Sequence, residues 1–146
     1  MAFLLNHLYK FEINTGTEAT PKWSKLAKGI LSVSPDLNEE SDENYYYDGS
    51  GMATRDITGL MVSYEFEGHR AYGDEAQDFI FGKALQVGEG RKVEFRVTEP
   101  SGDKFEGLAT VSDITLAGGD ANAKGEVSFT IAFDGLPEFT EAPVTS

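Results

Sequence analysis

The 146-residue sequence predicts a mainly β protein, an antiparallel β-sandwich or partly open barrel with one α-helix on its flank. Three observations predict this class. Apolar and polar residues alternate in several segments of strand length, and two such segments are joined by a tight turn at Pro100–Asp103. Only one segment, about residues 74–87, has the apolar period of a helix, which is 3.6 residues.

The first two alternating segments are residues 8–13 and 31–37. Both have the pattern of a strand with one buried face. Because Pro35 lies in the second segment and has no N–H group, this strand is expected at a sheet edge or a bulge. Trp23 lies between the two segments and is expected to anchor the core or its rim.

The alternation breaks down from about residue 38 to 57. The run Asp36–Glu43 includes Glu39 and Glu40, holds five acidic residues and no base, and is followed by Tyr45, Tyr46 and Tyr47. Long loops in compact domains usually carry function or are disordered, and tyrosine is enriched at interfaces. We interpret this stretch as an arm, for example a hairpin, that reaches onto a partner. The alternative is a mobile loop whose tyrosines fold back on their own domain.

The helical segment has a defined start and a second apolar side. Asp74 is expected to cap its N-terminus, with Gln77 completing a capping box. Phe81 and Leu85 fall opposite the main apolar stripe. Either the helix frays at Gly82, so that both side chains turn back into the core, or a neighbouring subunit covers them. The stripe itself consists of Ala76, Phe79, Ile80, Ala84 and Val87.

The remaining alternation predicts further strands at residues 60–66, 93–97, 105–116 and 127–133. A polar loop at 118–125 precedes the last of them, and residues 138–146 read as a loose tail. The length and the continuity of the pattern indicate one domain over residues 1–146.

Composition excludes several classes of function. The net charge is −13, with +2 over residues 1–35 and −15 over the rest, so the chain should repel a phosphate backbone. The absence of cysteine excludes disulfides, thiolate metal sites and cysteine nucleophiles. No apolar run approaches the roughly 20 residues of a membrane span, and Met1–His7 lacks the features of a signal peptide. The sequence therefore predicts a protein made in a cytoplasm and not held in a membrane.

Catalytic and metal-binding patterns are not found. His7 and His69 have no ligand partner at metal-site spacing, and no dinucleotide, phosphate-loop or serine-elbow motif occurs. Glu65 and Glu67 share a strand face, as a glycosidase pair would, but adjacent acids on a solvated face are far commoner. We expect no enzyme, no catalytic residue, no cofactor and no metal.

Several short motifs occur in an order that resembles the major tail tube protein of long-tailed bacteriophages. The motifs cover nearly the whole chain and are specific mainly by their order and spacing. They are Lys28-Gly29-Ile30, Tyr46 to Gly49, Thr58-Gly59, Phe66 to Arg70, Gly73 to Ile80, Gly118 to Ala121, and Phe133-Asp134-Gly135.

This resemblance implies a structural subunit of hexameric rings that stack into a hollow tube, with an acidic lumen through which DNA passes during ejection. It implies that the arm, including Glu39, Glu40 and Tyr45–Tyr47, reaches the adjacent ring, and that Phe81 and Leu85 lie near a subunit boundary. The lumen-lining candidates are Glu65, Glu67, Ser128 and Thr130. Expected partners are other copies and the initiator or baseplate, tape-measure and terminator proteins. The expected location is the virion tail, with assembly in the host cytoplasm.

Alternatives stay open at this point. Related tubes occur in contractile tails, type VI secretion and tail-like bacteriocins, and the chain could be the tube subunit of a bacteriocin. A monomeric β-sandwich that binds carbohydrate through Trp23 and the tyrosines is a second alternative. A small hydrolase that uses Glu65 or Glu67 is a third.

Overall fold

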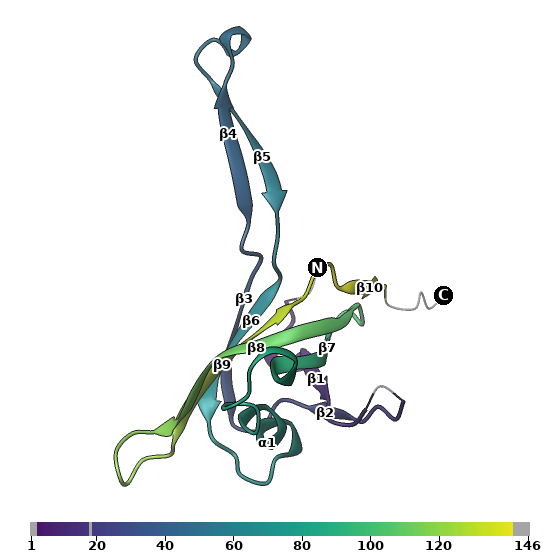
Figure 1. Cartoon of the computed structure of the whole chain (residues 1–146), viewed down its shortest axis with the longest axis vertical. Helices are drawn as coiled ribbons and strands as arrows, with labels where there is room; N and C mark the ends of the chain where they lie inside the picture. Colours follow the sequence, from purple (N-terminus) through teal and green to yellow (C-terminus); the bar gives the residue numbers. More distant parts are fainter. Residues whose placement is uncertain (1–2, 18, 142–146) are drawn as a thin grey trace.

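The computed structural model describes residues 3–17 and 19–141 and shows one curved antiparallel sheet, a separate hairpin and one α-helix (Figure 1). The main sheet has the strand order β2-β1-β7-β8-β9-β6-β3, and β10 pairs with β8. The hairpin consists of β4 and β5, which form a two-stranded sheet of their own.

In Lys92–Thr98 and Glu126–Phe133, where the sheet covers the core, buried residues alternate with more exposed ones. The strands are β1 (Lys10–Asn14), β2 (Trp23–Lys25), β3 (Ile30–Asp36), β4 (Glu40–Tyr45), β5 (Ala53–Gly59), β6 (Ser63–His69), β7 (Lys92–Thr98), β8 (Lys104–Gly118), β9 (Glu126–Phe133) and β10 (Glu138–Thr140). The helix is α1 (Glu75–Phe81), and short 3-10 turns occur at Asn6–Leu8, Tyr47–Gly49 and Gly88–Arg91.

The main sheet curls around an aromatic core. Phe11 of β1 contacts Phe66 of β6 with ring centroids 5.2 Å apart, although three strands separate β1 from β6 along the sheet. Phe66, Phe95, Phe129 and Phe133 are buried, and Phe11 is partly buried against them. Aromatic pairs of this kind contribute beyond the area that they bury. The end strands β2 and β3 are not paired with each other in the described chain, so the barrel is open.

This architecture confirms the predicted fold class, a mainly β, partly open antiparallel barrel with one flanking helix. Pro35 lies in β3, an end strand of the sheet, as expected for a residue without an N–H group. The long excursion after β3 is the β4–β5 hairpin, and Figure 1 shows it projecting far from the sheet.

In the sheet, two predicted segments have boundaries that are wrong by more than two residues. The strand expected at 60–66 begins only at Ser63, because Leu60 and Met61 are exposed at the junction with the hairpin. Residues 138–140, expected in a loose tail, form β10, in which Phe139 packs on Phe105 of β8. The rest of the predicted tail from residue 142 on lies outside the described residues.

Gly68 allows β3 to approach β6 closely. A Cβ atom at this position would lie 2.1 Å from the backbone oxygen of Gly29 and 2.8 Å from the Cα of Ile30. Because both neighbours are backbone atoms, no rotamer change can relieve the overlap. We expect Gly68→Ala to lower the free energy of unfolding by about 1–3 kcal/mol or more, measured by urea unfolding.

Gly49→Ala is the matched control for that substitution. Gly49 lies in the turn of the hairpin, where an added Cβ meets no atom within 4 Å. Its unfolding midpoint should equal that of the wild type. Equal midpoints for both variants would contradict the proposed backbone contact.

Candidate assembly surfaces

We call residues 40–59, which form β4, β5 and the turn between them, the arm. The register runs from Glu40 opposite Gly59 to Tyr45 opposite Ala53. At its base, Asn38 has a left-handed backbone with φ 46°. The Nδ2 atom of Asn38 donates to the oxygen of Met61 at 2.9 Å and to Oγ of Ser63 at 2.8 Å. These bonds tie the arm to the start of β6.

The arm contributes no residue to the core. A two-stranded hairpin alone in water is only marginally stable. Exposed apolar patches rimmed by polar residues are typical of interaction sites. The arm therefore has the properties of a segment that packs on another molecule. Its large exposed apolar and aromatic residues are Tyr45, Tyr46, Tyr47, Met52 and Ile57.

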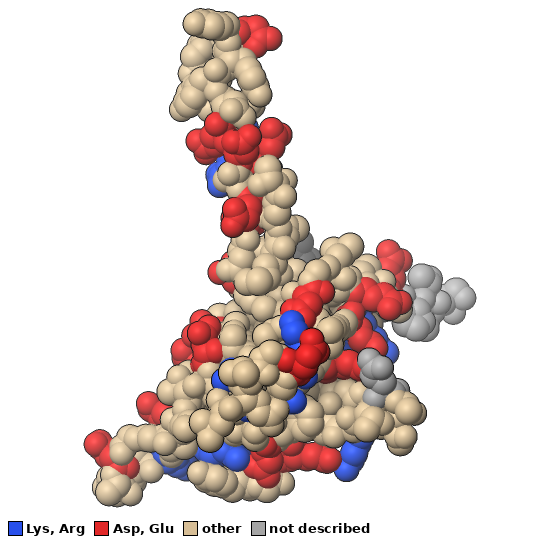
Figure 2. Space-filling view, in the orientation of Figure 1, with Lys and Arg blue, Asp and Glu red and all other residues tan. Residues whose placement is uncertain are grey.

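The arm is also acidic. Residues 40–59 hold five acidic residues and one base, Arg55. Figure 2 shows most of the arm's carboxylates along its length and a further one near its tip. Glu39 and Glu40, which the sequence indicated as contact residues, lie at the base of the arm and are exposed.

The four predicted lumen residues lie side by side on the outer face of the sheet. Glu65 of β6 is opposite Thr130 of β9, and Glu67 is opposite Ser128. Both glutamates are exposed, whereas Phe66 between them is buried in the core. We call Glu65, Glu67, Ser128 and Thr130 the polar strip. Polar residues extend it onto both neighbouring strands, namely Ser32 and Ser34 of β3 and Ser112 and Thr115 of β8.

The polar strip carries hydroxyl and carboxylate groups but no metal cluster. In the part of the chain that the structure describes, no group of three or more His, Asp or Glu side chains could hold a metal ion. Within the same residues, no helix is long and apolar enough to span a bilayer.

The helix is shorter than predicted. It ends at Phe81 instead of continuing to about residue 87, and turns follow from Gly82 on. Arg91 holds these turns by donating to the backbone oxygens of Ala84 at 2.8 Å and Gln86 at 2.9 Å. The apolar stripe therefore stops at Ile80, and Val87 is exposed.

Phe81 and Leu85 have different environments. The Phe81 ring meets Phe129 edge-to-face at 5.8 Å and lies under the guanidinium of Arg70 at 4.8 Å. Phe81 thus turns back into the core, as the fraying alternative predicted. Leu85 does not, because it is 96% exposed on the loop that follows the helix.

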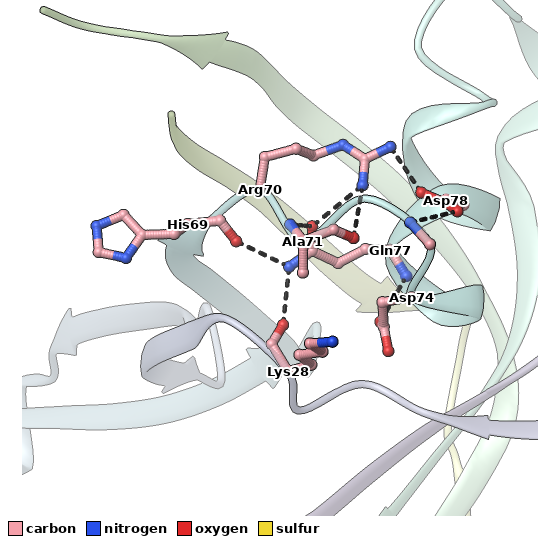
Figure 3. A network of polar contacts seen from close by, with 8 residues as sticks. Lys28, His69, Arg70, Ala71, Asp74, Gln77 and Asp78 are labelled. Carbon is pink, nitrogen blue, oxygen red and sulfur yellow. Dashed lines mark hydrogen bonds and ion pairs between the residues drawn. The ribbon is translucent and has the colours of Figure 1, made fainter. Parts of the chain in front are cut away.

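Gln77 is fully buried and joins the helix to the end of β6 and to the turn before β3, a role that sequence reasoning missed (Figure 3). Its Nε2 donates to the backbone oxygens of Lys28 at 2.9 Å and His69 at 3.0 Å. Its Oε1 accepts from the N–H of Ala71 at 2.9 Å. Asp74 caps the helix by accepting from the N–H of Gln77, as predicted, but the Gln77 side chain does not complete the capping box.

Tyr64 and Asp134 have shifted pKa values, and both make structural contacts. Burial raises the pKa of Tyr64 to about 12, with a smaller contribution from Glu99. Burial alone would raise the pKa of Asp134, but hydrogen bonds from Lys92 and Thr110 hold it below its usual value. Asp134 joins the end of β9 to β7 and β8, and the Tyr64 ring packs against Phe95 in the core.

No protein-family model matches the sequence, and no curated protein matches it. Solved structures do match. The first is the tail of an empty gene transfer agent particle with C6 symmetry, with a TM-score of 0.68 and 18% identity over 94% of this chain and 99% of that chain.

Two further solved structures have the same fold. The SPP1 tail tube has a TM-score of 0.64 and 17% identity over 97% of this chain and 81% of that chain. The tube-terminating cap of the anti-feeding prophage has a TM-score of 0.58 and 18% identity over 97% of this chain and 94% of that chain. The chain has the fold of phage tail tube proteins, which confirms at the level of structure the resemblance seen in its sequence.

Proposed function

We propose that this chain is a structural subunit of a phage tail tube and assembles into hexameric rings that stack into a hollow conduit. The observation that carries the proposal is the arm, an exposed apolar and acidic hairpin that contributes no residue to the core that the structure describes. The fold supports the same function, because the matching structures include a tail with C6 symmetry and a tail tube.

The arm supplies the contacts between rings in this proposal. Glu39 and Glu40 lie at its base and Tyr45, Tyr46 and Tyr47 toward its tip, all exposed. Tyrosines bury large areas at low entropic cost when they meet a partner.

Neighbours within a ring meet near the loop after α1. Leu85 projects there into solvent, and Phe81 supports the same loop from the core side. Covering an exposed leucine by an adjacent subunit would remove apolar surface from water.

The polar strip lines the lumen in this proposal. Glu65 and Glu67 give it negative charge, and Ser128 and Thr130 give it hydroxyl groups beside them. Carboxylates repel phosphates, so DNA would pass without being held. The protein would then act by assembly and passive conduction, without turnover or cofactor. Its partners are other copies and the initiator, tape-measure and terminator proteins, and its location is the virion tail after assembly in the host cytoplasm.

Electron microscopy of the purified chain tests the proposal. One sample is concentrated alone, and a parallel sample is mixed with a lysate that contains the initiator complex. We expect rings or hollow tubes with sixfold end-on averages in at least the second sample. Monomers in both samples, verified by sedimentation velocity, would overturn the proposal.

A further inference from the structure

The two strands of the arm divide its side chains between two faces. Residues directly opposite in an antiparallel pair point to the same side, and successive residues alternate. One face, called here the neutral face, carries Ser41, Glu43, Tyr45, Ala53, Arg55 and Ile57. The other, called here the acidic face, carries Asp42, Asn44, Thr54 and Asp56.

The neutral face has balanced charge and exposed apolar groups. Its single acid and single base pair with each other, Glu43 to Arg55 at 3.8 Å, and Arg55 also donates to Oγ of Ser41 at 3.4 Å. Tyr45 is 72% exposed and Ile57 49% exposed on the same side. This face can lose its water against a partner without leaving an unpaired charge.

The acidic face differs. Asp42 and Asp56 lie directly opposite one another, and Asn44 donates to Asp42 at 3.1 Å. Among the described residues, neither carboxylate forms an ion pair with a lysine or arginine. Burying an unpaired carboxylate is far more costly than burying an apolar group. This face is therefore best left in water.

We infer that the arm docks on a second copy of the chain through its neutral face and keeps its acidic face in water; this inference rests on the proposed function. The charge of the chain favours this assignment. A second copy carries a net charge of −13, so it repels Asp42 and Asp56, while the neutral face meets no net repulsion.

Cysteine labelling distinguishes the two faces, because the chain has no cysteine of its own. Ala53 and Thr54 are adjacent, both exposed, and on opposite faces of the same strand. Ala53→Cys and Thr54→Cys are each labelled with a soluble maleimide, once as free subunits and once as assembled tubes. We expect assembly to abolish labelling at position 53 and to leave labelling at position 54 unchanged.

The outcomes separate the inference from the proposed function. If tubes form and position 54 is protected instead, or both positions label equally, the docking face is wrong although the chain still builds tubes. If the wild type forms no tubes with the initiator present, the proposed function fails and the inference fails with it.

If only Ala53→Cys prevents assembly, Tyr45→Ser and Asn44→Ser are compared for tube yield. Loss in Tyr45→Ser alone supports the neutral face, and loss in Asn44→Ser alone overturns it.

Discussion

A variant that lacks residues 44–50 is expected to fold like the wild type and to form no stacked tubes. The deleted segment is the end of β4 and the turn of the arm, including all three consecutive tyrosines. None of its residues belongs to the core or packs against it. The deletion thus removes the proposed contact between rings while it leaves the curled sheet intact.

The deletion requires two measurements. Electron microscopy with the initiator lysate reports assembly, and thermal unfolding followed by circular dichroism reports the stability of the domain. We expect no tubes and a melting temperature close to that of the wild type. Normal tubes from the shortened chain would show that the arm is not the stacking element, and a large loss of stability would show that it supports the domain.

Gln77→Leu is expected to cause the largest loss of stability by a single substitution that conserves side-chain size. The change leaves the oxygens of Lys28 and His69 and the N–H of Ala71 without their partner in a buried site. Each such unsatisfied group costs about 1–3 kcal/mol, so we expect a total near 3 kcal/mol or more. That is a large part of the 5–15 kcal/mol by which domains are typically stable.

Urea unfolding of dilute, unassembled protein measures this effect. Gln86→Leu is the control, because Gln86 is exposed on the loop after the helix and its side chain donates to the backbone oxygen of Gly82 at 3.3 Å. Its unfolding free energy should change by no more than about 0.5 kcal/mol. Similar midpoints for the two variants would contradict a structural role for the Gln77 network.

The strands that cover the core were predictable, because burial of one face forces alternation in the sequence. Val93, Phe95 and Val97 show it in β7, and the N-cap at Asp74 was equally local. The exposed hairpin of the arm was predictable for the opposite reason. Nearly all residues of its two strands are exposed, so no buried face requires apolar and polar residues to alternate there. The segment is instead rich in acidic residues and tyrosines.

Other features depend on distant partners and left no local signal. Gly82 marked where the helix could end, but the hold of Arg91, further along the chain, on the turns after Phe81 had no such signal. The spacing of Gln77 from Asp74 predicts a capping box, but the partners of its side chain, Lys28 and His69, belong to other segments. Likewise, the pairing of Glu65 with Thr130 required the register of β6 on β9, which sequence alone does not give.

The open edge of the sheet bears on the lifetime of a free subunit. Strand β3 is an end strand, and an unpaired edge is a template on which other chains can add and aggregate. Pro35 lies within β3, and a proline on an edge strand is accommodated with its nitrogen on the unpaired side. The open edge therefore lacks an N–H donor at this position. A strand of another chain that paired with β3 would lose one hydrogen bond there. A free subunit with this edge therefore has a lower tendency to aggregate through β3 before it assembles.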